Sequence, residues 1–308
     1  MFQARIVEYF LRFLAHIPLP VLHALGSFAG FLLDSFSSVH RRVAAINIAL
    51  CFPHMSPGER RALVRTTLGE TARTALEMGP LWFLPVERVE RLIREVHGEE
   101  HVRAGLAAGK GLILAVPHLG SWEAVGLYVG KRYPMTSLYR PSRKPAMDYI
   151  ARDGRQRSGA TLVPTDASGV KKLYERLQTG GIIAILPDQD PRYGAGVFAP
   201  FFGIVAKTMV LLPKMARRSG APVVYAWARR LPRGAGFALH FSPAPADVAH
   251  SDLHIAATAM NAGVEDCVRR APEQYQWSYK RFRSRPDGEP SLYRRRALSC
   301  DSRNEDTL

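Results

Sequence analysis

Apolar positions along the chain predict two kinds of element that alternate over its second part. Residues 111–116 and 181–186 are short, almost unbroken apolar runs next to Gly and Pro, which is typical of strands buried on both faces. Further strands are predicted at 135–139, 161–163, 223–228 and 237–241, and helices at 121–128, 145–157, 168–178, 205–217 and 251–270. This alternation indicates an α/β fold, in which a mainly parallel central sheet is flanked by helices.

The region before residue 111 is predicted to be helical. Residues 40–75 and 84–106 both carry a helical pattern, and the second helix is expected to end at a glycine. The first is interrupted at 51–53, where Cys-Phe-Pro breaks the pattern. A new helix is predicted there, with Ser56 as N-cap, Pro57 at its first position and Glu59 three residues after the cap, the spacing of a capping box.

The N-terminal segment 6–33 is largely apolar, although charged residues, histidines and prolines interrupt it. Its cleanest stretch, 17–33, has the shortest length that can cross a bilayer, which needs about 17–25 residues. A transmembrane anchor, an amphipathic helix lying in the membrane surface and a buried helical hairpin all remain open. We therefore predict a membrane anchor or interfacial helix at 1–35, one main domain at 36–282, and a flexible polar tail at 283–308.

Charge narrows the range of partners. The chain of 308 residues has 42 Lys and Arg against 27 Asp and Glu, a formal charge of +15. Such a charge attracts nucleic acid, anionic membranes, phosphorylated substrates or acidic proteins. The sequence has no helix-turn-helix, RNP-like or zinc-finger signature, so nucleic acid is not an expected partner.

Its three cysteines are far apart without a CxxC pair, which argues against disulfides and structural zinc and favours a reducing compartment.

The segment from Ala115 to Glu123, Ala-Val-Pro-His-Leu-Gly-Ser-Trp-Glu, carries the clearest chemistry. A buried strand leads into His118, Gly120 allows a tight turn, and Glu123 falls in the first turn of the next helix. A neutral imidazole can deprotonate a hydroxyl, while a carboxylate orients its ring and stabilises the cation that forms. The helix dipole would keep Glu123 ionised. His118 and Glu123 are therefore the predicted catalytic pair, although a histidine at a strand end can also be structural.

This segment and several others resemble one family. The His118-Leu-Gly-Ser-Trp-Glu123 segment looks like the H-x4-(D/E) motif of glycerolipid and lipid A acyltransferases. Other matching blocks follow in order and at similar spacing at 47–53, 138–141, 187–190, 201–203 with Thr208, 272–277 and 281–282. Together they are similar to the late acyltransferases of lipid A biosynthesis, the lauroyl and myristoyl transferases. An Asp at the fifth position and an E-G-T-R block, usual in glycerophosphate acyltransferases, are absent here, which favours a glycolipid acceptor.

The resemblance implies roles for individual residues. His118 would deprotonate the acceptor hydroxyl and Glu123 would hold and polarise it, so that the hydroxyl attacks an acyl thioester directly. The absence of a G-x-S-x-G elbow agrees with a reaction without an acyl-enzyme. Arg140 would bind phosphate or the oxyanion, unless it is an ordinary surface arginine. Asp188 would be a substrate-site residue that orients Arg140; with Asp190 it could instead suggest a metal, but a third ligand is not in view.

The resemblance also implies substrates and surroundings. The donor would be acyl carrier protein, with CoA as the other thioester source, and no cofactor or metal is expected. The acceptor would be a hydroxyl of a lipid A precursor, with another glycolipid, an aminolipid or a lysophospholipid as alternatives. A non-catalytic lipid-binding protein is the hypothesis from a different class. We expect a monomer at the bacterial inner membrane with its active site facing the cytoplasm, where its positive charge would steer acidic carrier protein and phosphorylated lipid. Phe198, Phe201 and Phe202 are expected to shape a wall for the acyl chain, although Phe201 and Phe202 could equally belong to the core.

Overall fold

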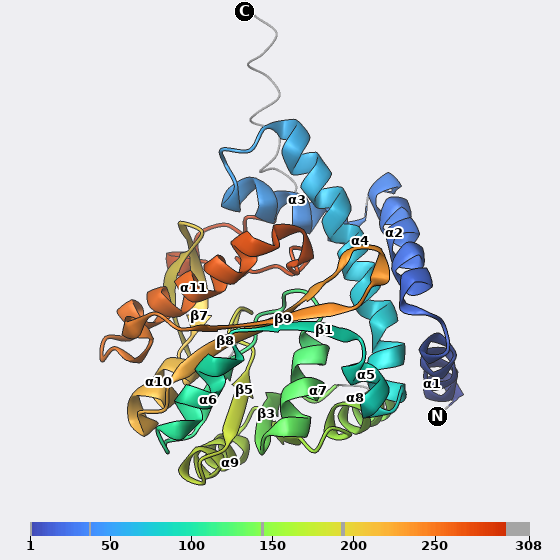
Figure 1. Cartoon of the computed structure of the whole chain (residues 1–308). Coiled ribbons are helices and arrows are strands. Elements are labelled where there is room, and N and C mark those ends of the chain that lie inside the picture. The colour runs from blue at the N-terminus through green and yellow to red at the C-terminus, as the bar shows by residue number, and fades with distance from the viewer. Residues whose placement is uncertain (1, 37, 143–144, 192–194, 294–308) are drawn as a thin grey trace, which may run out of the picture.

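The computed structural model describes residues 2–36, 38–142, 145–191 and 195–293, and it contains the predicted α/β fold (Figure 1). Its strands are β1 (Ile93–His97), β2 (Leu112–Ala115), β3 (Met135–Tyr139), β4 (Thr161–Pro164), β5 (Ile182–Ile185), β6 (Gly196–Phe201), β7 (Ile204–Met209), β8 (Val223–Arg230) and β9 (Phe237–Pro243). One sheet has the order β1-β9-β8-β2-β5-β3-β4, and β6 and β7 form a separate hairpin. Neighbours in the sheet are parallel except β8 and β9, which confirms the mainly parallel sheet.

Helices cover both faces of this sheet. They are α1 (Phe2–Ala15), α2 (Leu19–Ser35), α3 (Val39–Cys51), α4 (Pro57–Phe83), α5 (Val86–Glu90), α6 (Glu99–Ala107), α7 (Trp122–Arg132), α8 (Pro145–Gln156), α9 (Ala167–Gln178), α10 (Leu211–Ser219) and α11 (Leu253–Arg270). Leu112 and Leu114 of β2 join a core with α1, α2 and α7, whereas Ile113 and Ala115 join one with α3, α9, α10 and α11. Because successive strand side chains point to opposite faces, a strand between two helix layers needs an unbroken apolar run.

Helix boundaries show where the sequence pattern is informative and where it is not. The capping box at the start of α4 is confirmed, since Ser56 and Glu59 bond each other's backbone N–H groups. The helix predicted at 84–106 is wrong in part, because edge strand β1 lies between α5 and α6 and is too exposed to need an apolar run. The helix predicted at 205–217 begins only at Leu211, since β7 comes first. Phe202 and Gly203 close the β6–β7 hairpin with positive φ at both positions, as a two-residue turn of type I′ requires.

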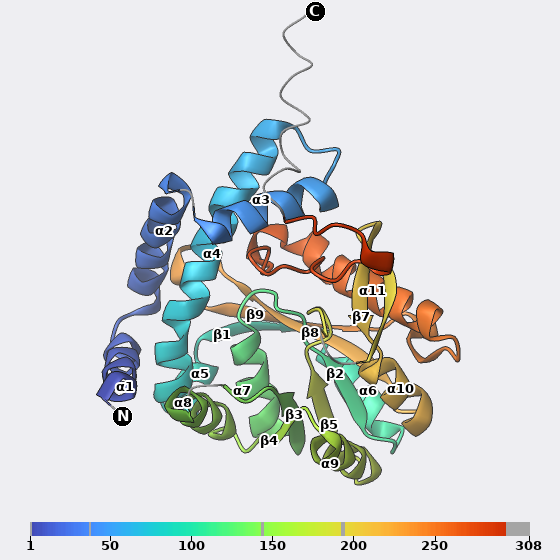
Figure 2. The ribbon, with the colours of Figure 1, turned by 180° about the vertical axis from the view of Figure 1, so that it is seen from behind.

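The N-terminal helices α1 and α2 pack along α4 on one flank of the molecule (Figure 1, Figure 2). A Cβ at Gly30 of α2 would come within 2.4 Å of the Gly69 backbone, so the helices cross in direct contact. The exposed large apolar side chains of α1, α2 and the residue after it are Ile6, Tyr9, Phe10, Phe13, Val21, Leu25, Phe28, Phe31, Leu32 and Phe36. Among the described helices, none alone is long and apolar enough to cross a bilayer, and only α2 with α3, bent by 86°, could do so by length and composition.

A buried charge network joins α2 to the sheet. Arg230, at the end of β8, donates to both oxygens of Glu77 of α4, at 2.7 and 2.9 Å. His23 of α2 bonds the same carboxylate at 2.7 Å. On its other side, the main chain of Arg230 exchanges two hydrogen bonds with the side chain of Gln274. The residues of this network are buried, so its charges are balanced within the protein rather than by water.

The end of the described chain packs onto the domain. Tyr293, which the sequence places in the polar tail, is buried. Its hydroxyl donates to the Asn47 side chain at 2.7 Å and accepts the N–H of Phe282 at 3.0 Å. Residues 294–308 of the predicted tail lie outside the described residues.

Candidate active site

His118 lies in a loop that continues from β2 and is held by its backbone. The His118 carbonyl accepts the N–H of Gln276, and the N–H of Gly120 donates to the carbonyl of Gln274. Gly120 has a φ of 59°, and a Cβ there would come within 1.9 Å of the Ala228 carbonyl oxygen. Only glycine fits this close approach between the loop and β8. The loop position of His118 is therefore fixed from two sides.

Asp188 is the carboxylate that contacts the His118 ring. Its Oδ1 lies 2.8 Å from Nδ1 of His118, and its Oδ2 accepts the main-chain N–H of the same residue at 2.9 Å. Asp188 follows β5, which runs parallel beside β2, so the carboxyl ends of these strands bring the two residues together. Burial opposes ionisation of Asp188, but the charge interaction and hydrogen bonds with His118 outweigh it and lower the pKa of Asp188. When the ring is neutral, the ionised carboxylate accepts its Nδ1–H, which leaves the lone pair on Nε2.

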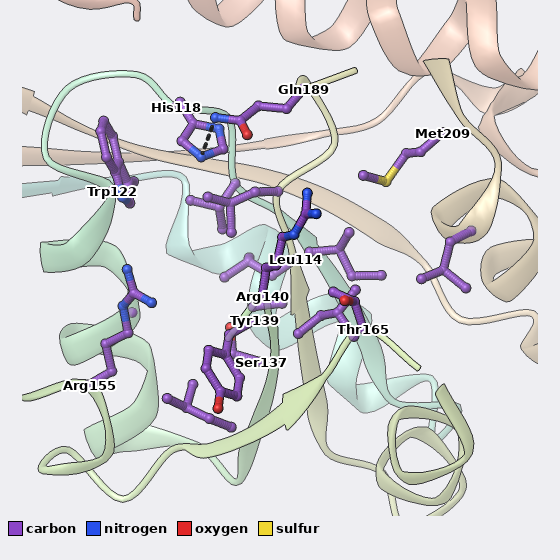
Figure 3. Close-up of a pocket in the computed structure, with 18 of the residues that line it drawn as sticks. Leu114, His118, Trp122, Ser137, Tyr139, Arg140, Arg155, Thr165, Gln189 and Met209 are labelled. Atoms are coloured by element: carbon purple, nitrogen blue, oxygen red, sulfur yellow. Dashed lines mark hydrogen bonds between the residues drawn. The ribbon is translucent and has the colours of Figure 1, made fainter. Parts of the chain in front are cut away.

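Gln189 contacts the other nitrogen of the ring. Its Nε2 lies 3.1 Å from Nε2 of His118 and 3.1 Å from Oε1 of Gln276, so the amide group donates to both (Figure 3). Trp122 packs edge-on against the imidazole with ring centroids 5.1 Å apart. The hydrogen bonds that link Asp188, His118, Gln189 and Gln276 all agree with one tautomer of His118. In this tautomer the ring donates to Asp188 through Nδ1 and accepts at Nε2.

Glu123 has different partners. It lies in the first turn of α7, where Trp82 donates to its Oε2 at 3.1 Å and Arg155 of α8 donates to its Oε1 at 2.6 Å. Burial opposes its ionisation, but the charge and hydrogen bonds of Arg155 outweigh burial and lower the pKa of Glu123. The structure therefore pairs Glu123 with Arg155 and places Asp188, not Glu123, in contact with His118.

A cavity of about 940 Å³ opens from His118 over the carboxyl ends of the strands (Figure 3). Its apolar lining includes Leu114, Val116, Leu127, Met135, Leu138, Leu162, Leu186, Met209 and Leu211. Three cationic residues, Arg140, Arg155 and Lys214, also line it. The volume is at the upper end of the range of about 300–1,000 Å³ for ligand pockets. A largely apolar cavity that is also lined by a histidine and by cations suits a long acyl chain whose reacting end is polar.

The structure brings the sequence-predicted residues together only in part. His118, Glu123 and Arg140 all line the cavity, with Arg140 exposed at the end of β3, while buried Asp188 supports His118 from behind. Within the described residues, the Asp188 carboxylate bonds the ring and the main-chain N–H of His118 and also interacts with the side chain of Tyr275, whereas no hydrogen bond joins it to Arg140. Phe201 and Phe202 pack with Phe52, Tyr275 and Trp277, which places them in the core rather than in the cavity wall.

Sequence reasoning missed three residues that the site uses. Gln189 and Gln276 lie inside blocks that carry the family resemblance, so their positions were visible although their role was not. Arg155 carries no such signal, since it is one of several arginines in its segment and lies 32 residues after Glu123.

Asp190, the second carboxylate of the Asp-x-Asp segment, accepts the N–H of Ser284 through Oδ2. Each of the two carboxylates therefore has a protein partner.

A histidine backed by a carboxylate beside a large apolar cavity is compatible with acyl transfer, and comparison with known proteins shows that the protein is an O-acyltransferase and identifies its family. The family model for bacterial lipid A biosynthesis acyltransferases matches residues 2–284, so the chain belongs to this family. The lipid A biosynthesis lauroyltransferase of Escherichia coli K12 is 34% identical over 278 residues, which cover 90% of each chain. The palmitoleoyltransferase of that strain is 31% identical over 279 residues and 90% of each chain. Its myristoyltransferase is 28% identical over 280 residues, 91% of this chain and 85% of the relative.

Proposed function

We propose that the protein transfers a fatty acyl chain from acyl carrier protein to a hydroxyl of a lipid A precursor, with His118 as the general base. The family supports the acylation of lipid A. The observation that supports this chemistry is the bonding of His118, whose Nδ1 faces an ionised carboxylate while its Nε2 faces the cavity side. A base fixed in this way can take a proton only at Nε2.

The reaction needs one proton transfer in each direction. His118 Nε2 takes the proton of the acceptor hydroxyl as the oxygen attacks the thioester carbonyl carbon. The tetrahedral intermediate then collapses, the C–S bond breaks, and the carrier thiol leaves with the proton from His118. Asp188 stabilises the imidazolium that exists between the two transfers, which is the role of the third member of a catalytic triad. The chemistry needs no cofactor and no metal ion.

Gln189 marks the place of the acceptor hydroxyl. Its amide now donates to the nitrogen that must accept the hydroxyl proton, 3.1 Å away, so the acceptor has to displace it. The displaced amide stays beside the reacting carbon and can donate to the developing oxyanion, as side-chain amides do in other acyl transfers. Arg140 lines the same cavity and provides a cation for the oxyanion or for a phosphate of the acceptor.

Glu123 affects the reaction indirectly, through the residues that it positions. Its carboxylate fixes Arg155, which lines the cavity, and Glu123 lies in the first turn of the helix whose first residue, Trp122, packs against His118. We therefore assign Glu123 as a positioning residue for the cavity wall and for the tryptophan. This role explains an acidic residue five positions after the histidine without a hydrogen bond between the two.

The exposed apolar surface of α1 and α2 supports attachment to a membrane. Aromatic and aliphatic side chains face outward on both helices, while the opposite sides pack on α4. Helices of this kind bury their apolar face in the boundary between headgroups and acyl chains. We propose that the protein is a monomer attached in this way to the bacterial inner membrane, with its cavity open to the cytoplasm, where acyl carrier protein is found.

Lipid A from a strain that lacks the gene provides the test. The strain is complemented with the wild type, with His118→Ala or with an empty vector, and lipid A is analysed by mass spectrometry. We expect the wild type alone to restore a species heavier by one acyl group. Identical lipid A in all three strains would contradict the proposed acceptor. Restoration by His118→Ala, with the protein shown to be present and folded, would contradict the proposed base.

A further inference from the structure

Helix α10 carries a basic surface beside the cavity. Its residues of high exposure are Lys214, Arg217 and Arg218, so every strongly exposed position of this helix is a cation. The spacing i, i+3, i+4 places them on one face. The side chain of Lys110 lies against Gly220, the C-cap of α10, and adds a fourth cation. We name these four residues the α10 surface.

The charges of the α10 surface are only partly used within the protein. The Arg218 guanidinium lies over the ring of Tyr174 in α9 at 5.0 Å, and Arg217 donates to the Ser251 carbonyl at 3.4 Å. Neither interaction neutralises a charge. Glu175 of α9 lies 3.9 Å from Lys171, and Asp247 is the exposed acid in the short helix beside α10. Arg217 and Arg218 also interact favourably with the C-terminal end of the helix dipole. The partial negative charge at that end is smaller than the positive charge of the α10 surface.

The α10 surface is continuous with the active-site cavity. Met209, Val210, Leu211 and Lys214 line that cavity, and Arg217 and Arg218 follow one turn further along the same helix. A molecule that binds the exposed face of α10 is therefore next to an entrance to the space that holds His118. Such a position suits a partner that must deliver a tethered group into the cavity.

The α10 surface also lies away from the apolar helices. In both views of the ribbon, α10 is on the flank opposite α1 and α2 (Figure 1, Figure 2). A membrane bound by α1 and α2 would leave α10 accessible from the aqueous side. This arrangement favours a soluble macromolecule over a lipid surface as the ligand of these cations.

From these observations we infer that the α10 surface is the docking site for the acidic carrier protein that brings the acyl thioester. The inference rests on the proposed carrier-bound donor. The cations attract the acidic protein and orient it, while its prosthetic arm passes Lys214 and places the thioester at His118. Charged residues at the edge of an interface act mainly on the rate of encounter and on its salt dependence.

The experiment compares two donors in the purified, full-length protein. The double variant Arg217→Glu/Arg218→Glu leaves the cavity lining unchanged, and Arg61→Glu/Arg91→Glu, at exposed positions away from α10, is the charge-matched control. We expect the α10 variant to lower kcat/KM for acyl carrier protein at least tenfold and to leave kcat/KM for the small donor acyl-pantetheine within twofold. The control should behave as the wild type with both. The salt dependence with the carrier should also become weaker in the α10 variant.

Other outcomes overturn the inference in distinguishable ways. An equal loss with both donors would show a structural role of the two arginines, and an unchanged carrier reaction would place docking elsewhere. Loss of binding to vesicles of anionic phospholipid by the α10 variant alone, with carrier kinetics intact, would assign the surface to the membrane. Wild-type turnover of acyl-pantetheine without turnover of the carrier thioester would instead refute the donor in the proposed function.

Discussion

The identity of the carboxylate that orients His118 can be tested by one substitution, Asp188→Asn. Oδ2 of Asp188 accepts a main-chain N–H, so the new carboxamide must keep its oxygen there and turn its NH₂ group toward Nδ1 of His118. Two donors cannot face each other, so the ring proton moves to Nε2 and the base is lost. The loss of the correct tautomer in a triad reduces kcat by about 10⁴. We expect a reduction of about 10³–10⁴, equivalent to about 4–5.5 kcal/mol in the activation barrier.

The comparison variant is Glu123→Gln. It removes the charge that holds Arg155 but retains an oxygen for Trp82, and Asp188 stays in place. We expect a loss of about 2 kcal/mol in the free energy of unfolding, typical of a hydrogen bond between charged groups, and a kcat within about 30-fold of the wild type. Steady-state kinetics with saturating acyl donor measure kcat, and urea unfolding followed by circular dichroism measures stability.

The ratio of the two effects decides the assignment. A kcat for Asp188→Asn within tenfold of the wild type, with a loss of 10³ or more for Glu123→Gln in folded protein, would refute the reasoning. Glu123 would then be the residue that orients His118, and the bonding of the free enzyme would differ from that of the reacting complex. Equal large losses in folded variants would mean that both carboxylates act on the base.

Three further predictions follow from other contacts. Gln189→Ala should lower kcat about 100-fold without raising the KM of the acceptor, because it removes an oxyanion donor and the group that the acceptor displaces; a higher KM with unchanged kcat would count against this role. Gly120→Ala should reduce the free energy of unfolding by about 3 kcal/mol or more, measured in urea, because its Cβ meets the Ala228 carbonyl and its φ is positive; wild-type stability would show that the loop can move away. Burial lowers the pKa of His240 to about 4, so the unfolded chain binds more protons between pH 4 and 6.5; stability from this residue is present above pH 6.5 and is lost toward pH 4. His240→Phe should therefore make the fall in stability over that range less steep, and an unchanged slope would contradict the assignment.

The central part of the fold could be predicted because β2 and β5 are buried on both faces. Such strands must be apolar throughout, so they stand out in the sequence as short apolar runs next to Gly and Pro. Their parallel pairing also accounts for the contact between His118 and Asp188, since both residues follow directly after these strands. Edge strand β1 was not predictable in the same way, because an exposed edge puts few constraints on side chains.

Side-chain pairing was harder to predict than position. The sequence pattern predicted His118 in the turn after a buried strand and Glu123 in the first turn of the next helix, where the structure has them, but spacing does not show which group each side chain meets. Arg155 comes from α8, and its approach to Glu123 depends on how that helix packs against α7. Such contacts arise only from tertiary structure, so a pattern in one segment cannot reveal them.

The charge network around Arg230 means that α1 and α2 are not a detachable anchor. Hydrogen bonds lead from His23 of α2 through Glu77, Arg230 and Gln274 to the N–H of Gly120, in the loop that carries His118. Removing α2 would expose the buried Glu77–Arg230 ion pair to water and would remove the close contact between Gly30 and Gly69. A shortened protein designed for solubility would thus lose part of the support for its catalytic loop. In this enzyme, the helices proposed to contact lipid are also a structural part of the catalytic domain.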